Sequence, residues 1–180
     1  MSQNTVIENP YSIEFIEKSR TLDATLNQKA EKTSSTENVQ KLCGWHPCTK
    51  MCFTCIHFKE VIESIHMHGT KEIFIINERL SCESNSVIYV IDCLKCNMQY
   101  LGSSVDKMKL RANKWRSDIL QGVEDEKTKK VVRHFNATPH NISRDLRSIA
   151  VEKVFGTKDV LEIKETMYIK KFDMIKNGLN

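Results

Sequence analysis

The seven cysteines of this 180-residue chain constrain its fold more than any other feature, because four of them fall within thirteen positions. The Cys-x2-Cys spacing occurs twice, at Cys52/Cys55 and at Cys93/Cys96. This spacing forms a turn in which two thiolates can share one tetrahedral zinc ion. The first ten residues lack the basic and apolar segments of a secretory signal, so we expect an intracellular protein with reduced thiols. Metal binding is therefore favoured over disulfides.

An upstream zinc site is predicted from three closely spaced cysteines and one later cysteine: Cys48, Cys52, Cys55 and Cys82. The fourth ligand is the least constrained, and Cys43 or His46 is an alternative to Cys82. We expect three further histidines to face solvent: His57, His66 and His68.

Apolar patterning predicts a mixed α/β chain with a small antiparallel three-stranded sheet flanked by helices. A β-branched run around Tyr89 and the segment after Cys96 read as a hairpin of two strands. The expected strands are 73–76, 87–91, 98–101 and 147–155, the last three forming the sheet. The expected helices are 58–68, 107–121, 128–135 and 159–176, with Gly122 ending the second of these.

Three regions are expected along the chain: a polar segment 1–42 with a linker at 27–40, a cysteine-rich zinc-binding appendage 43–82, and a domain 83–180. No apolar run is long enough to span a membrane. Between Ser103 and Arg147, eleven Lys and Arg residues face six Asp and Glu residues. This local excess fits a nucleic-acid surface, and a solvated helix face is the alternative.

Two charged residues fall on apolar helix faces, where each needs a partner. Arg111 shares a face with Met108 and Trp115, and Glu165 shares one with Leu161 and Phe172. The two charges indicate either a buried ion pair or a site for phosphate and metal. A third alternative for Arg111 is a side chain that reaches solvent from the edge of the face.

The order of motifs resembles the GIY-YIG endonucleases. Ile88-Tyr89 is followed, after ten residues, by Tyr100-Leu101-Gly102 and then by Ser104, Met108 and Arg111 at the family spacing. Glu165-x2-Tyr168-Ile169 and a terminal Gly178-Leu179-Asn180 complete the pattern. The chain departs from it with Val87 in place of Gly, Ser104 in place of Thr, and Trp115 where the family often has His.

Within that family the chain is most similar to the endonuclease domain of Penelope-like retroelements, which carries a Cys-x2-Cys in the hairpin and two later histidines. The resemblance implies a second zinc site with four ligands: Cys93, Cys96, His134 and His140. Without a metal, these would be two buried thiols and two surface histidines. The resemblance also implies DNA as the partner and a nuclear location, and leaves the oligomeric state open.

The implied activity is metal-dependent nicking of DNA, with Mg²⁺ or Mn²⁺ as cofactor in addition to Zn²⁺. Tyr89 would act as general base or orient the attacking water, and Tyr100 would position the phosphate. Arg111 would clamp the phosphate, Glu165 would hold the Mg²⁺, and Asn180 would brace the site. The alternatives are a catalytically inactive zinc module that binds nucleic acid or protein, and a zinc-binding regulator unrelated to nucleases.

Overall fold

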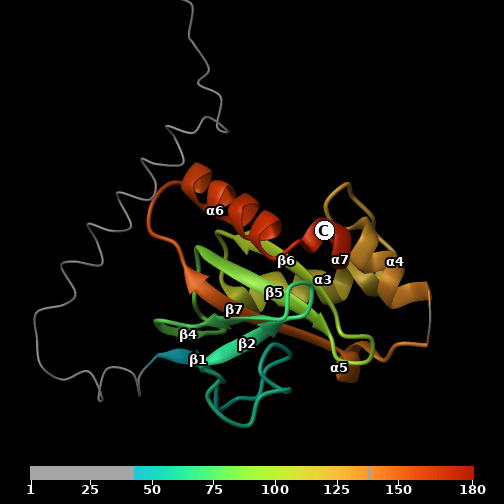
Figure 1. Ribbon diagram of the computed structural model, residues 1–180. Helices are drawn as coiled ribbons and strands as arrows, with labels where there is room; N and C mark the ends of the chain where they lie inside the picture. The colour runs from blue at the N-terminus through green and yellow to red at the C-terminus, as the bar shows by residue number, and fades with distance from the viewer. Residues whose placement is uncertain (1–42, 138) are drawn as a thin grey trace, which may run out of the picture. The chain divides into compact units, whose positions relative to one another are not determined.

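The computed structural model describes residues 43–137 and 139–180 (Figure 1). The expected polar segment 1–42 and its linker lie outside the described residues. The strands are β1 (Gly44–His46), β2 (Ser64–Met67), β3 (Glu72–Ile75), β4 (Arg79–Ser81), β5 (Val87–Cys93), β6 (Met98–Ser104) and β7 (Leu146–Lys153). The helices are α3 (Met108–Gln121), α4 (Lys129–Ala137), α5 (Ile142–Asp145), α6 (Lys158–Lys171) and α7 (Met174–Asn177).

The central sheet has three antiparallel strands in the order β6-β5-β7. Every residue of β5 is buried, as expected for a β-branched strand that is covered on both faces. The predicted fold class, a mixed α/β chain with a three-stranded antiparallel sheet and flanking helices, is confirmed. The predicted end of the helix at Gly122 is also confirmed, since Gly122 adopts a left-handed conformation with φ of 66°.

The alternation of side chains along β6 assigns one helix to each face of the sheet. Tyr100 and, on β5, Tyr89 both face α3, where Trp115 contacts both of them. Ser103 points to the opposite face and donates a hydrogen bond to Glu165 of α6. β6 is an edge strand of the sheet, and α6 lies in front of the sheet in Figure 1 while α3 lies behind it.

The cysteine-rich segment adds two small strand pairs, β1 with β4 in parallel and β2 with β3 antiparallel. Its buried side chains, among them Trp45, Phe58 and Leu80, belong to the same hydrophobic core as β5 and α3. The N-terminal appendage therefore packs directly on the sheet domain. The division at residues 82 and 83 stays a prediction.

One predicted helix is wrong, and another is wrong in part. Residues 58–68 form no helix, because Ser64 to Met67 alternates between exposed and buried positions and pairs as β2. The predicted helix 159–176 is broken: α6 ends at Lys171, and Asp173 has a φ of 50°, which an α-helix does not allow. The short helices α5 and α7 and the strands β1 and β4 were not predicted.

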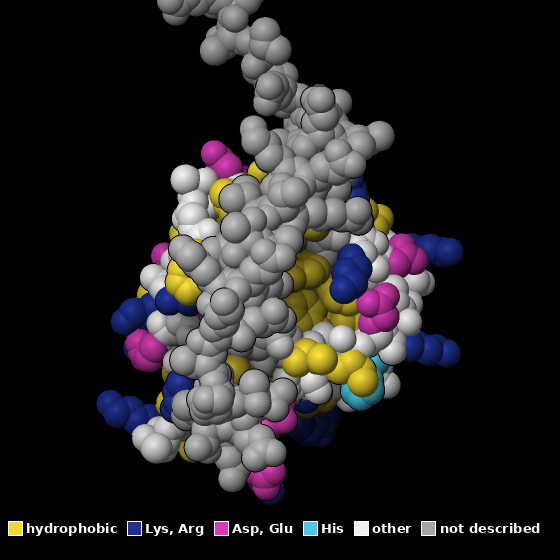
Figure 2. All heavy atoms as spheres, turned by 60° about the vertical axis from the view of Figure 1, so that its left-hand side comes forward, with side chains coloured by type: hydrophobic (Ala, Val, Ile, Leu, Met, Phe, Trp, Pro, Cys, Tyr) yellow, Lys and Arg dark blue, Asp and Glu magenta, His cyan; other side chains and the backbone are white. Residues whose placement is uncertain are grey.

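Within residues 43–137 and 139–180, the helices are too short or too polar to cross a bilayer. Figure 2 shows one face of the molecule, on which hydrophobic side chains lie at the centre and Lys and Arg side chains are interspersed with acidic ones. Where the grey atoms leave this face visible, the basic residues are therefore scattered.

Candidate active site and metal centres

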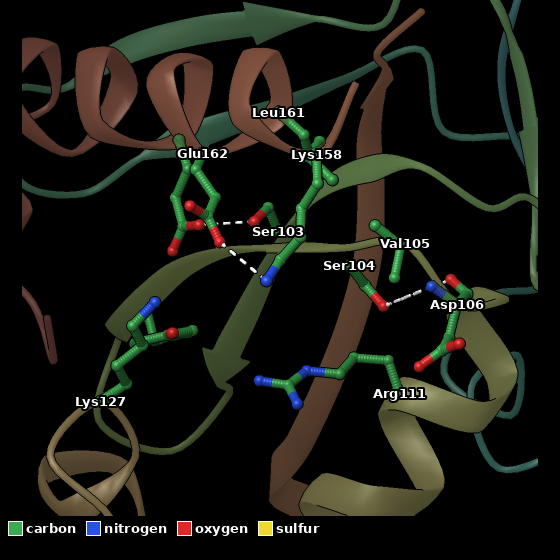
Figure 3. A pocket seen from close by; sticks show the side chains of 11 residues that line it. Ser103, Ser104, Val105, Asp106, Arg111, Lys127, Lys158, Leu161 and Glu162 are labelled. Carbon is green, nitrogen blue, oxygen red and sulfur yellow. Dashed lines mark hydrogen bonds and ion pairs between the residues drawn. The ribbon is translucent and has the colours of Figure 1, made fainter. Parts of the chain in front are cut away.

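A polar cavity lies at the free edge of β6, between the start of α3 and the first half of α6. In Figure 3, Arg111 reaches into it from α3, while Lys158 and Glu162 point into it from α6. Tyr100, Glu165 and Lys127 also line it. The cavity thus brings three predicted site residues together, from positions 100, 111 and 165 of the chain.

Arg111 is held by aromatic groups. Its Nε donates a 2.8 Å hydrogen bond to the Tyr89 hydroxyl, and its guanidinium lies 5.1 Å from the centre of the Trp115 ring. Burial opposes the charge, yet the interaction with Tyr89 raises the pKa of Arg111. No carboxylate of the described residues forms an ion pair with Arg111. Its terminal nitrogens therefore remain available to an anion in the cavity.

Tyr89 is fully buried and does not line the cavity. Its hydroxyl oxygen accepts hydrogen bonds from Arg111 Nε and, at 2.9 Å, from Trp115 Nε1. Burial raises the pKa of Tyr89, although the charge of Arg111 acts in the opposite direction. These contacts suit a residue that orients Arg111, and its expected role as general base stays a prediction.

Tyr100 lies at the cavity wall and packs edge-on against Trp115, with ring centres 5.1 Å apart. Burial raises the pKa of Tyr100 above its ordinary value, so its hydroxyl keeps its proton and can donate it to an acceptor. The tyrosine is therefore suited to contact a phosphate oxygen or a water molecule in the cavity.

Only glycine fits at position 102 of β6, because the Tyr89 side chain lies over it. A Cβ atom at this position would lie 2.8 Å from the Tyr89 hydroxyl and 2.7 Å from the Tyr100 ring. Real Cβ atoms do not approach other heavy atoms so closely, so any larger residue would displace one of the two rings. The glycine of the Tyr-x-Gly motif thus has a steric reason here.

Glu165 is half-buried and accepts a 2.5 Å hydrogen bond from the Ser103 hydroxyl. No cation of the described residues pairs with it, and it does not contact Arg111. The buried ion pair that the sequence left open is therefore not formed. Two groups of opposite charge instead face one cavity, each bonded only to neutral side chains.

Asn180 binds the free edge of β6. Its side-chain amide accepts a 2.9 Å bond from the Leu101 N–H and donates a 2.7 Å bond to the Leu101 carbonyl. The Leu179 N–H adds a 2.7 Å bond to the Gln99 carbonyl, and Lys130 contacts the main-chain oxygen of Asn180. These bonds satisfy part of the edge strand that carries Tyr100.

The first metal cluster contains the four cysteines predicted for the upstream site. Their sulfur atoms all lie within 4.8 Å of one another: Cys48, Cys52, Cys55 and Cys82. A backbone hydrogen bond from Cys52 is the main cause that lowers the pKa of Cys48 to about 7. The alternative ligands lie elsewhere, since Cys43 Sγ bonds the Asn77 carbonyl and His46 lies beside Arg79. The cluster could hold zinc.

The second cluster contains the other predicted set, again with ligand atoms within 4.8 Å: Cys93, Cys96, His134 and His140. Cys96 Sγ and His140 Nε2 are 3.3 Å apart, close to the separation of about 3.5 Å between two ligands of a tetrahedral zinc ion. His134 Nε2 is buried without a hydrogen-bond partner. Such an unsatisfied nitrogen among two thiols fits a metal ligand.

Of the three histidines expected in solvent, His66 and His68 are exposed. His57 is not: it is half-buried, and its Nε2 makes no hydrogen bond. Burial and the charge of Arg147 lower the pKa of His57. The expected exposure of His57 is therefore wrong, because its ring packs into the cysteine-rich segment near Arg147.

We expect about two zinc ions per chain, because the structure contains two four-ligand clusters. Elemental analysis of freshly purified protein measures this directly. Cys52→Ala and Cys96→Ala should each reduce the content to about one, whereas Cys43→Ala, outside both clusters, should leave it unchanged. Folded protein without zinc would contradict both sites.

Sequence reasoning missed Ser103, which orients Glu165, and Lys158 and Glu162, which line the cavity and form a 3.4 Å ion pair with each other. The alternation of side chains along a strand could have indicated Ser103, because Ser103 must face away from Tyr100 and Gly102. Lys158 and Glu162 lie one turn apart at the start of α6, but no pattern in the sequence connects them with β6.

No family model matches this chain, and no curated protein matches it. Among solved structures it is similar to the catalytic domain of the homing endonuclease I-TevI, at 26% identity and a TM-score of 0.45 over 53% of this chain and 97% of that one. It is also similar to a mutant of that catalytic domain, described as an intron endonuclease, at 25% identity and a TM-score of 0.46 over 54% and 93%. Because both TM-scores lie below 0.5, neither likeness is evidence of a shared activity.

Proposed function

We propose that this chain is a metal-dependent endonuclease of the GIY-YIG type that nicks DNA. The observation that carries the proposal is the cavity beside β6, where the guanidinium of Arg111 and the carboxylate of Glu165 face the same space without pairing. A phosphodiester with a divalent cation would supply both missing partners at once. The order of motifs from Tyr89 to Asn180 supports the same reading.

The N–H groups of Arg111 would serve two purposes: one fixes the side chain, and the others would bind the phosphate. One N–H is donated to Tyr89, which fixes the plane of the guanidinium and leaves the terminal nitrogens to hold two phosphate oxygens. Tyr89 and Trp115 are thereby positioning residues, and the protonated Tyr100 hydroxyl donates to the phosphate or to the attacking water.

Glu165 would hold the Mg²⁺ or Mn²⁺ ion, and Ser103 would keep its carboxylate turned toward the cavity. A lone carboxylate is a suitable protein ligand for Mg²⁺, which takes its other ligands from water and substrate oxygens. When bound, the cation would neutralise charge on the scissile phosphate. Asn180 would keep β6, and hence Tyr100, in register.

Lys127 and Lys158 extend the positive side of the cavity beyond Arg111 (Figure 3). They approach it from different elements, the loop before α4 and the start of α6. Two lysines beside one scissile phosphate are suited to bind the neighbouring phosphates of a strand. This arrangement favours a polynucleotide over a single small phosphate ester.

DNA binding should be strongly salt-dependent and largely independent of sequence, because the proposed contacts are made to phosphates. Charge reversal at Lys127, Lys129 and Lys130 should weaken binding and reduce the salt slope by about one for each phosphate that is no longer bound. Titration of labelled duplex at several salt concentrations measures this, with Lys59→Glu as control. An affinity that stays constant from low to moderate salt would contradict the prediction.

Nicking of supercoiled plasmid tests the function itself. Zinc-loaded protein should convert supercoiled to open-circular DNA when Mg²⁺ is added, and EDTA should stop the reaction. Because EDTA can also remove zinc, a parallel reaction contains neither Mg²⁺ nor EDTA and tests the need for Mg²⁺ alone. A chain that binds plasmid but leaves it supercoiled at all Mg²⁺ and Mn²⁺ concentrations is not a nuclease.

The alternative, an inactive zinc-dependent binding module, is favoured by one observation. Trp115 stands where the family often has His, and an indole can donate a hydrogen bond but cannot take up a proton. A retroelement origin is supported by the cysteine pair inside the hairpin and the two later histidines. A nuclear location is supported by the proposed DNA substrate and by thiols suited to zinc.

A further inference from the structure

Helix α3, which carries Arg111, begins without a side-chain cap. Its N-cap residue is Lys107, which makes no capping bond, and the first turn contains no acidic residue. The first N–H groups of any helix have no acceptor inside the helix, so they must find acceptors elsewhere. For α3 these acceptors come from a distant segment of the chain.

The segment Cys82–Ser84 supplies the missing cap. The Met108 N–H donates to the Ser84 carbonyl, and the Lys109 N–H donates to the Cys82 carbonyl, both at 2.8 Å. Between them, the Glu83 carboxylate pairs with Lys109 at 2.5 Å and with Lys107 at 3.1 Å. A negative charge at this end also suits the dipole of the helix.

Cys82 belongs to two structures at once. Its main-chain carbonyl caps α3, and its sulfur lies in the cluster with Cys48, Cys52 and Cys55. A metal ion bound by the four sulfurs would fix the position of Cys82, and through its carbonyl the first turn of α3. Without the metal, this loop would lose its link to Cys48, Cys52 and Cys55 and would be held by its own hydrogen bonds between Ser81 and Ser84 and by packing.

Arg111 lies at the end of this same turn. It is the fourth residue of α3, and its N–H donates to the carbonyl of Lys107 at 3.2 Å. If the cap is lost, two N–H groups lose their acceptors and the first turn frays, so that the Arg111 backbone moves with it. The hydrogen bond from Arg111 Nε to Tyr89 would then be lost as well.

We propose that the metal of the four-cysteine cluster positions Arg111 through the Cys82–Ser84 cap, so that occupancy of this site controls phosphate binding in the cavity. The proposal rests on the proposed nuclease function for its consequence, but its structural part does not. Cys82, Glu83 and Ser84 are positioning residues, since they reach the substrate only through α3.

The second cluster is the natural comparison. It connects with α3 at the opposite end, where Asn136 of α4 donates a 3.0 Å bond to the Ile119 carbonyl. Loss of metal from Cys93, Cys96, His134 and His140 should therefore leave the first turn of α3 intact. Loss of metal from the first cluster should therefore disturb the start of α3, and loss from the second should not.

The test compares Cys52→Ala with Cys96→Ala, each of which removes one ligand from one cluster. NMR hydrogen exchange follows the amides of Met108 and Lys109 and the Nε proton of Arg111, while elemental analysis counts zinc. Cys52→Ala should lose one zinc and exchange these three protons at least about ten times faster, and Cys96→Ala should lose one zinc without this change. Cys52→His, which restores a fourth ligand, should recover both zinc and protection.

The nicking assay then separates this idea from the proposed function. Misplacement of Arg111 by about 1 Å should lower kcat/KM about 100-fold in Cys52→Ala and much less in Cys96→Ala. If the wild type never nicks, the exchange data still decide whether the cap depends on the metal. If Cys52→Ala loses zinc but keeps all three protons protected, the proposal is overturned while the nuclease function can stand.

Glu83→Lys provides a variant with all four sulfurs intact, in case Cys52→Ala does not fold. It should keep two zinc ions, accelerate exchange at Lys109 and lower kcat/KM several-fold. Glu60→Lys makes the same charge change at an exposed position of the cysteine-rich appendage and should neither accelerate this exchange nor lower kcat/KM. Identical behaviour of Glu83→Lys and Glu60→Lys would overturn the proposed cap.

Discussion

Arg111→Ala and Glu165→Gln should each reduce nicking of supercoiled plasmid by about 100- to 1,000-fold at saturating DNA, since each removes charge stabilisation from the transition state. Arg111→Lys should recover little of the loss, because an ammonium group cannot hold two phosphate oxygens as a fork and cannot keep the bond to Tyr89. Glu165→Gln keeps the shape and the bond from Ser103, so only cation binding should fail.

Stability measurements decide between this reading and a structural ion pair. Removing one partner of a buried pair usually costs about 3–5 kcal/mol of unfolding free energy. Because Arg111 and Glu165 do not touch, we expect Glu165→Gln to change the free energy of unfolding by less than about 1 kcal/mol. Arg79→Ala and Glu63→Gln, at exposed positions, are the matched controls for nicking. Wild-type nicking by either site variant would refute the proposed function.

Short-range spacing explains why three ligands of the upstream site were well constrained and why the fourth, predicted as Cys82, was the least constrained. Cys52 and Cys55 must be close in any fold, but Cys82 lies far along the chain. The choice is made by the parallel pairing of β1 with β4, in which His46 lies opposite Ser81. That register places the residues after the two strands, Cys48 and Cys82, beside each other. Pairing of two three-residue strands leaves no readable pattern in the sequence.

The central strand and the helix after it were predictable from local sequence alone. The continuous β-branched run from 87 predicts a buried strand, the helical spacing of apolar residues predicts the helix from 107 to 121, and the structure follows both. The segment 58–68 mixes apolar residues with two histidines, and its spacing is compatible with either period until β3 pairs with it. Tertiary pairing, and not local propensity, decides its conformation.

Helical faces located Arg111 and Glu165 but could not show what each would contact. A charged residue on an apolar face needs a partner, and the sequence offered each charge as a partner for the other. In the structure, Arg111 contacts Tyr89 and Trp115, and Glu165 accepts a hydrogen bond from Ser103. These contacts depend on the sheet separating α3 from α6, which no local pattern encodes. The burial of Tyr89 follows from its β-branched strand, but the contacts of its hydroxyl with Arg111 and Trp115 could not be foreseen for the same reason.

Gly102→Ala should be the most damaging single-methyl change in the sheet. The added Cβ would lie less than 3.0 Å from both the Tyr89 hydroxyl and the Tyr100 ring, and Tyr89 is fully enclosed and cannot move aside. Overpacking of this kind costs about 1–3 kcal/mol. Displacement of the Tyr89 hydroxyl would also break the bond that orients Arg111, so nicking should fall about 100-fold even where the variant folds.

Urea unfolding of zinc-loaded protein measures the loss of stability, and a double-mutant cycle with Tyr89→Leu identifies its cause. Leucine removes the hydroxyl and ring carbon that the new methyl group would meet. Gly102→Ala should therefore cost at least about 1 kcal/mol less in the Tyr89→Leu background than in the wild type. Equal costs in both backgrounds would mean that the Tyr100 ring or the backbone, and not the Tyr89 side chain, makes the glycine necessary. The steric link from Gly102 through Tyr89 to Arg111 would then have to be abandoned.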